Sequence, residues 1–221
     1  MCGRLAVTLP NDAMAQIFAA SPANNLPAVP NFNVCPTVNI HAVFNEGEGR
    51  KLVPMRWGFL PHWYKKLNDG PLLINARAET IAEKPAFRAA CRERRCLIPA
   101  TGFYEWTKTE EGARLPWYIT PKDGEPCVFA GIWQDWEKEG ERIRSVAIVT
   151  TGANEMMSNI HKRMPVSLAP NEWGLWLGED GKGAAQLMVP APEDRFQAHR
   201  VDPKVNSNRA SGPELIEPIE D

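Results

Sequence analysis

Apolar and polar positions alternate over short stretches through the middle of the chain, and this period-two pattern predicts β-strands rather than helices. Glycine, proline and charged turns separate the stretches. The segments that carry the pattern are "FNVCPTVNIHAVF", "KLVPMRWGFLP", "RCLIPATGFYEW", "LPWYIT", "CVFAGIWQDW", "RSVAIVTT", "MPVSL" and "FQAHRV". We therefore expect strands to dominate the middle of the chain.

Helical patterns are fewer and short. Asn11 is a good helix N-cap, and Met14, Ile17 and Phe18 behind it share one face. The stretch "ETIAEKPAFRAACRERR" (79–95) also predicts a helix, broken or restarted at Pro85. Two further short helices are expected from "ANEMMSNIH" and "PNEWGLWLG".

Strands and helices do not alternate regularly, which argues against a Rossmann or TIM-barrel architecture. A length of 221 residues suits one domain. We expect a single α+β domain, residues 1–221, built on a curved, barrel-like, mostly antiparallel sheet with short peripheral helices. Four acids and no base follow Ser211, so we also expect a flexible acidic tail from about residue 213.

Composition adds limits to this picture. The net charge of −2 argues against binding to nucleic acid through bulk charge, but it leaves room for a local basic groove. Five bases and one acid lie from Lys84 to Arg95. This cluster is either a nucleic-acid binding face or a solvated helix surface. With no apolar run that could span a bilayer and no signal peptide, we expect a cytoplasmic protein with reduced cysteines.

Cys2 is the first candidate for chemistry. Removal of Met1 would leave an α-amine and a thiol on adjacent carbons of one residue. An amine with a pKa of about 7.7–8.0 can attack an aldehyde to give an imine. The thiol can then close a five-membered thiazolidine in an intramolecular step. An incidental cysteine near the end of the chain is the alternative.

Two further residues suit proton transfer. In "GFYEW", Glu105 shares a strand face with Phe103, and partial desolvation there would raise the pKa of its carboxyl. That would suit a general acid or base, whereas an exposed strand glutamate is the alternative. In "NIHKRMP", His161 precedes Lys162 and Arg163, whose charges favour the neutral imidazole. A structural histidine is the alternative there.

Two segments combine polar groups with aromatics. In "LLINARAET", Asn75 and Arg77 share a face if the segment is a strand. The alternative is a helix cap, with Thr80 or Asn75 ending the strand. The segment "RWGFLPHWYKK" mixes aromatic and basic side chains, as in surfaces that stack bases and grip phosphates of single-stranded nucleic acid. These side chains are Trp57, Trp63 and Tyr64 with Arg56, Lys65 and Lys66. The alternative places Trp57 in the core and the two lysines on a solvated turn.

Taken in order, these motifs resemble the signature blocks of one family. The blocks are "MCGR", "NVCP", "RWGFLPHW", "INARAET", "GFYEW" and "IHKRMP", and "NSNRASGPELIEP" resembles the last segment. Together they are similar to the SOS response-associated peptidase (SRAP) family of abasic-site processing proteins. The resemblance covers almost the whole chain.

The resemblance implies a positively charged groove for single-stranded DNA on a barrel-like domain, with no metal, cofactor or membrane. It implies that Met1 is lost and that Cys2 forms a thiazolidine with the ring-opened aldehyde of an abasic site. The covalent DNA–protein cross-link would shield the lesion from strand cleavage. It also implies an autoproteolytic peptidase activity, a lyase-like activity, a monomeric state and association with the nucleoid when bound to DNA.

The resemblance also assigns roles to single residues. Asn75 would hydrogen-bond near the Cys2 adduct, and Glu105 would shuttle protons during imine formation. His161 would protonate the sugar oxygen as the ring opens and help to reverse the link.

The remaining implied roles concern DNA binding. Arg4 and Arg77 would hold phosphates that flank the lesion, and Arg163 is a weaker candidate for the same role. Trp63 and Tyr64 occupy the place of an aromatic wedge that blocks duplex on one side.

Two other functions stay open on the sequence. One is a cysteine peptidase that uses Cys2 with His161 and Glu105 on peptide substrates. The other is a non-covalent reader of damaged or modified DNA through the Trp63 region. In "NVCP", Cys35 stands where alanine is commoner in the family, which adds a second thiol near the expected site.

Overall fold

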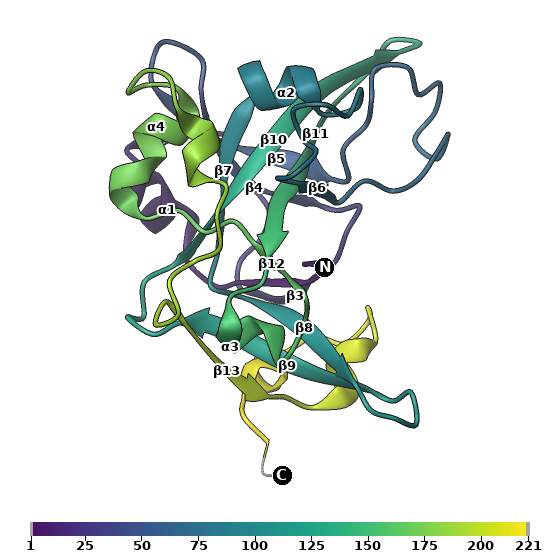
Figure 1. Cartoon of the computed structure of the whole chain (residues 1–221). Helices are drawn as coiled ribbons and strands as arrows, with labels where there is room; N and C mark the ends of the chain where they lie inside the picture. The colour runs from purple at the N-terminus through teal and green to yellow at the C-terminus, as the bar shows by residue number, and fades with distance from the viewer. Residues whose placement is uncertain (1, 220–221) are drawn as a thin grey trace.

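Five strands form a closed barrel, which lies in the upper half of the molecule in Figure 1. The computed structural model describes residues 2–219. The barrel strands are β4 (Asn39–Asn45), β5 (Arg50–Trp57), β7 (Arg95–Ala100), β10 (Cys127–Lys138) and β11 (Glu141–Gly152). Their order is β11-β10-β7-β4-β5, and parallel pairing of β11 with β5 closes the ring.

A second sheet lies below the barrel in Figure 1 and supports the N-terminal strand. In sheet order its strands are β13 (Phe196–Arg200), β9 (Arg114–Pro121), β8 (Gly102–Lys108), β1 (Leu5–Val7) and β3 (Asn31–Val34). Three short strands extend the barrel sheet: β2 (Ala20–Pro22), β6 (Asn75–Arg77) and β12 (Arg163–Pro165). Most pairings are antiparallel, so the predicted α+β, barrel-like fold is confirmed.

Helices are short and peripheral, as predicted: α1 (Asn11–Ile17), α2 (Arg88–Glu93), α3 (Glu155–Ser158) and α4 (Trp173–Leu177). The prediction of a helix over 79–95 is wrong for its first half, where the chain forms turns up to Phe87. The predicted break at Pro85 agrees with this, because a proline disfavours the α region for the residue before it, here Lys84.

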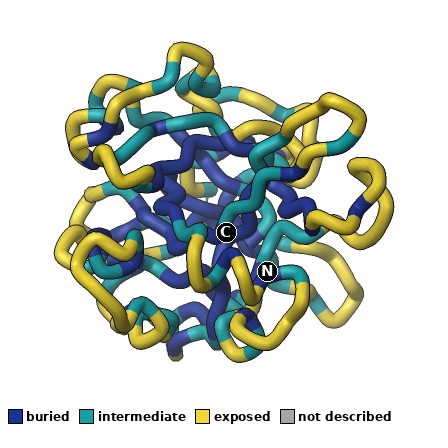
Figure 2. The backbone as a smooth tube through the Cα atoms, turned by 90° about the horizontal axis from the view of Figure 1, so that it is seen from above, coloured by how far each residue is buried: buried dark blue, intermediate teal, exposed yellow. Residues whose placement is uncertain are grey.

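The core follows the alternation of the strands. Trp57, Phe44 and Phe129 are almost fully buried inside the barrel strands, and Figure 2 shows buried segments concentrated in the centre with exposed loops around them. Trp57 is thus a core residue and does not belong to a base-stacking surface. Burial of such large apolar side chains is the main stabilising contribution to folding.

More of the C-terminal segment packs against the domain than we expected. Pro213–Ile216 forms a 3-10 helix, and Leu215 is fully buried. It lies in a small apolar cluster with Tyr104, Tyr118 and Val205. The segment from residue 213 to Ile216 is therefore docked rather than free, because burial of Leu215 anchors it. Residues 220–221 lie outside the described part.

Replacing Leu215 with alanine should lower the free energy of unfolding by about 2–5 kcal/mol, the usual cost of truncating a fully buried leucine. Urea denaturation measures this change. Glu214→Ala, on the exposed neighbour, is the matched control and should stay within about 0.5 kcal/mol of wild type. Equal stability of the two variants would show that the segment is not anchored by Leu215.

Candidate active site around Cys2

Cys2 lies just before β1 and is fully buried. The Asn75 side chain donates a hydrogen bond from Nδ2 to the Cys2 carbonyl oxygen at 3.1 Å. Asn75 begins β6, and its parallel pairing with Ile148 of β11 fixes its position. The Asn75 Oδ1 is buried and has no hydrogen-bond partner among residues 2–219. The structure thus brings two predicted site residues into direct contact and leaves one acceptor available.

Glu105 lies on β8, where its side chain is 2% exposed, and Phe103 on the same face is fully buried. The structure thus decides against the exposed strand glutamate that was the alternative for Glu105. Burial raises the pKa of the Glu105 carboxyl, and the nearby His161 opposes that shift. Burial also raises the pKa of the Cys2 thiol, and the charge of Glu105 adds to the effect. Cys2 and Glu105 are therefore electrostatically coupled, and both hold protons more readily than in water.

His161 follows α3, and its backbone N–H donates to the Met157 carbonyl oxygen at 2.8 Å. The Arg163 N–H lies 3.0 Å from Nδ1 of the imidazole, and the Arg163 carbonyl oxygen lies 3.1 Å from the same atom. Nδ1 can therefore accept a hydrogen bond in the neutral form and donate one in the charged form. The backbone holds the ring by this edge in both protonation states.

A polar hollow of about 350 Å³ lies beside Glu105 and His161. It is lined by Gly3, Arg4, Glu105, Trp106, Lys108, Arg114, His161 and Asn206. Arg4, Lys108 and Arg114 thus line the same hollow as the buried carboxyl of Glu105.

Sequence reasoning predicted Arg4, Glu105 and His161 but missed the other polar side chains of this hollow. Lys108 lies two residues after Trp106 on the same strand, and that spacing was a usable signal. Arg114 reaches the hollow through the register of β8 and β9, which places it opposite Lys108.

A second hollow of about 570 Å³ begins at Asn75. Its lining is mostly apolar: Trp63, Leu73, Asn75, Arg77, Thr80, Lys84, Pro85, Ala86 and Phe87. Trp63 is 45% exposed, and the Arg77 side chain is also exposed. Their positions suit stacking on a base and contact with a phosphate. The two hollows adjoin Cys2, the polar one through Gly3 and the apolar one through Asn75.

Tyr64 does not share this surface. It is 7% exposed and packs with Leu60 and Trp136, and its hydroxyl donates to the Pro71 carbonyl oxygen at 3.2 Å. Trp63 alone of the two aromatics can therefore meet a ligand in this conformation.

Arg163 forms a bidentate ion pair with Glu79, at 2.6 and 2.9 Å. This pair lowers the pKa of the Glu79 carboxyl. A carboxylate that already occupies the guanidinium would compete with a phosphate, so the structure gives the weaker phosphate candidate a different partner.

Arg4 is held from two directions. Its Nη1 donates to Asn33 Oδ1 and to the Val205 carbonyl oxygen, each at 2.6 Å. Asn33 in turn donates to the carbonyl oxygens of Ser207 and Ala210, at 3.0 and 2.6 Å. The C-terminal segment and β3 together fix this guanidinium at the edge of the polar hollow.

The described residues offer few other sites. Within residues 2–219, no group of three or more His, Cys, Asp or Glu side chains could hold a metal ion. No helix in that range has the length and apolar character needed to cross a membrane. Cys35 follows Val34, the partner of Leu5 in β3, so this second thiol lies close to Arg4.

The fold and the site together define a barrel domain in which Cys2, Asn75, Glu105 and His161 lie close to one another. The family model "SOS response associated peptidase (SRAP)" matches residues 1–208. The chain belongs to the SRAP family.

Relatives of known name span nearly the same length. The abasic site processing protein YoqW of Bacillus subtilis (strain 168) is 39% identical and covers 85% of this chain and 86% of its own. YedK of Escherichia coli (strain K12), which bears the same description, is 30% identical and covers 99% and 100%. HMCES of Rattus norvegicus, described likewise, is also 30% identical, over 100% of this chain and 76% of its own.

Solved structures show the same fold. A crystal structure of a protein from Bacteroides thetaiotaomicron superposes with a TM-score of 0.87 at 24% identity, covering 99% of this chain and 100% of that one. A protein from Bordetella bronchiseptica gives a TM-score of 0.73 at 27% identity, over 91% and 100% of the two chains. Family membership and fold therefore agree.

Proposed function

We propose that this protein senses abasic sites in single-stranded DNA and joins them covalently through Cys2, after removal of Met1. The observation that carries the proposal is the convergence of Cys2, Asn75, Glu105 and His161 from four separate segments. The relatives named abasic site processing proteins support the same substrate. We take the protein to act as a monomer in the cytoplasm, at the nucleoid when bound to DNA.

The first chemical step joins the Cys2 amine to the aldehyde of the opened sugar. A C–N bond forms, and loss of one water leaves an imine. His161 donates a proton to the sugar oxygen as the ring opens. Glu105, with its raised pKa, takes a proton from the amine and returns one to the departing hydroxyl.

The second step closes the ring. The Cys2 sulfur attacks the imine carbon, an S–C bond forms, and the thiol proton moves to the imine nitrogen through Glu105. The product is a neutral thiazolidine that lacks the C=N bond needed as electron sink for β-elimination. The strand therefore stays intact beside the lesion.

The surroundings of Cys2 suit an adduct at this position. The buried Asn75 Oδ1 lacks a partner among residues 2–219 and can accept a hydrogen bond from the ring nitrogen. The polar hollow offers Arg4 to a flanking phosphate, and the apolar hollow offers Trp63 and Arg77 to the other side of the lesion. A strand that bends through both hollows would bring its abasic position to Cys2.

A cysteine peptidase acting on other peptides has less support. Peptidase thiols react as thiolates, and their pKa lies below the ordinary value. Burial and the charge of Glu105 instead raise the pKa of the Cys2 thiol well above it. Closure of a thiazolidine fits this group better, because the thiol proton is itself needed at the imine nitrogen.

A denaturing gel tests the proposal. Wild-type protein mixed with a single-stranded oligonucleotide that carries one abasic site should give a heat-stable shifted band. Mass spectrometry of that band should show the chain without Met1. The same oligonucleotide with a tetrahydrofuran analogue, which has no aldehyde, should give no band. A band with the analogue, or none with the true abasic site, would overturn the proposal.

A further inference from the structure

The hairpin of β8 and β9 carries two cations into the polar hollow. Lys108 and Arg114 are the outermost register pair of the two strands, and both side chains are exposed. Both also line the hollow that reaches Gly3 and Arg4. The hairpin extends away from the barrel beside the C-terminal segment (Figure 1). Lys108 and Arg114 therefore extend the positively charged lining of the polar hollow from Arg4 toward the tip of the hairpin.

Within residues 2–219, neither Lys108 nor Arg114 forms an ion pair with a carboxylate. Glu110 and Glu111 lie in the loop between them but do not line the hollow. Two cations held together without a counter-ion favour an anionic ligand.

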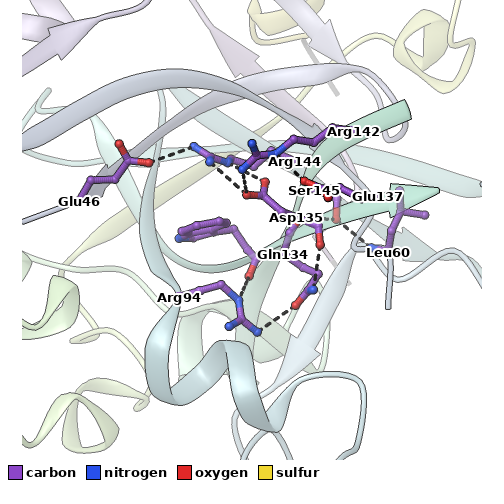
Figure 3. Close-up of polar contacts among 10 residues, drawn as sticks. Glu46, Leu60, Arg94, Gln134, Asp135, Glu137, Arg142, Arg144 and Ser145 are labelled. Carbon is purple, nitrogen blue, oxygen red and sulfur yellow. Dashed lines mark hydrogen bonds and ion pairs between the residues drawn. The ribbon is translucent and has the colours of Figure 1, made fainter. Parts of the chain in front are cut away.

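The hairpin at the other end of the molecule shows the opposite arrangement (Figure 3). There Asp135 accepts hydrogen bonds from Arg142 at 2.6 Å and from Arg144 at 2.9 Å. Glu46 and Glu137 add further ion pairs, at 3.7 and 3.2 Å. The arginines of that hairpin are thus paired within the fold, and they need no external anion.

The Trp106 ring packs against two of the cations that line the polar hollow, Arg4 and Arg114. The guanidinium carbon of Arg114 lies 5.3 Å from the centre of the Trp106 ring, and that of Arg4 lies 5.7 Å from it. Trp106 donates its Nε1 proton to Asn206 Oδ1 at 2.6 Å, and Asn206 Nδ2 donates to the Arg114 carbonyl oxygen at 3.5 Å. The binding surface is therefore held in place before a ligand arrives.

We propose that Lys108 and Arg114 form a second backbone subsite, which binds the phosphodiester groups of the DNA strand that leaves Cys2 on the Gly3 side. The inference rests on the proposed function for the identity of the strand. Because the subsite lies beyond the reacting atoms, it contributes to affinity and to the direction of the strand, and chemistry at Cys2 does not require it.

The salt dependence of non-covalent binding tests the subsite. The probe is a labelled single-stranded oligonucleotide with one tetrahydrofuran analogue, followed by fluorescence anisotropy over a range of NaCl concentrations. Each phosphate contact contributes about 0.7 to the slope of log K against log salt for single strands. Lys108→Ala/Arg114→Ala should therefore reduce the slope by about 1.4.

A matched control removes the same charge elsewhere. Lys122 and Lys138 form no ion pair within residues 2–219 and line neither hollow beside Cys2. Lys122→Ala/Lys138→Ala should keep the wild-type slope. A charge reversal, Lys108→Glu/Arg114→Glu, should weaken binding further than the alanine pair. Equal slopes for the alanine pair, the control and wild type would overturn the subsite.

Truncated probes test the direction. Removing the nucleotides on one side of the analogue should abolish the difference between wild type and Lys108→Ala/Arg114→Ala, and removing those on the other side should keep it. If the difference in slope between wild type and the alanine pair persists with both truncated probes, the inference is overturned. The gel with a true abasic site separates the two proposals. If the alanine pair lowers the salt slope but the wild-type protein forms no cross-link, the covalent function is refuted and the subsite stands.

Discussion

Replacing Cys2 with alanine should reduce the heat-stable cross-link below the detection limit of a denaturing gel. The variant keeps an α-amine once Met1 is removed, so it can still form an imine with the aldehyde. It lacks the sulfur that closes the ring, and an imine alone hydrolyses readily. Borohydride, which reduces the imine to a stable amine, should therefore restore a band for Cys2→Ala.

Cys91→Ala is the control for this result. Cys91 is a free thiol that is only half-buried and lies on α2, so its loss should leave cross-linking at the wild-type level. A heat-stable band from Cys2→Ala without borohydride would rule out the thiazolidine. A Cys2→Ala protein that gives no band even with borohydride would rule out the α-amine as the nucleophile.

Replacing Glu105 with glutamine should slow cross-link formation at neutral pH by about 10²–10⁴-fold, the usual contribution of a positioned proton-transfer group. The amide keeps the size and burial of the side chain but cannot accept a proton. The rate is measured by quenching samples of protein and abasic oligonucleotide over time. Glu110→Gln, on the exposed hairpin loop, should react like wild type. Equal rates for Glu105→Gln and wild type would remove Glu105 from the proton relay.

Glu105→Gln should slow the reaction but should make the folded protein more stable relative to wild type as the pH rises. Burial raises the pKa of Glu105 in the folded protein, so the folded state binds the proton more tightly than the unfolded state. The resulting stabilisation is complete below the unfolded pKa of about 4.3 and is lost as the pH rises through the folded pKa. Glu105→Gln lacks this loss, so its Tm relative to wild type should rise with pH across that window and then level off. A constant difference in Tm would contradict the raised pKa.

Local patterns in the sequence predicted much of the fold because they depend on neighbouring residues. Alternation placed Glu105 and Phe103 on one strand face but left open whether Glu105 is buried. It placed Asn75 and Arg77 on one face only on the condition that their segment is a strand. The helix over 79–95 was wrong in its first half because Pro85 outweighed an apolar period that looked helical. Tyr64 illustrates a different limit, since the sequence cannot show which of two adjacent aromatics turns into the core.

Contacts between distant segments could not be read from periodicity. The parallel pairing of β5 with β11 closes the barrel, and no local signal specifies it. The contact of Asn75 with Cys2 was expected only from the resemblance to the family. The cations of the polar hollow depend on hairpin register and on a late segment of the chain, so Arg114 and Asn206 escaped prediction.

The hydrogen bonds of Arg4 carry a consequence for biosynthesis. Its guanidinium is fixed by Val205, and its partner Asn33 is fixed by Ser207 and Ala210. A ribosome makes the Cys2 end of the chain first, and these three residues emerge only near completion. Under the proposed function, a nascent chain would therefore expose its amine and thiol without the finished DNA site around them. Selectivity for a lesion over any free aldehyde in the cell would then be acquired only when synthesis is nearly complete.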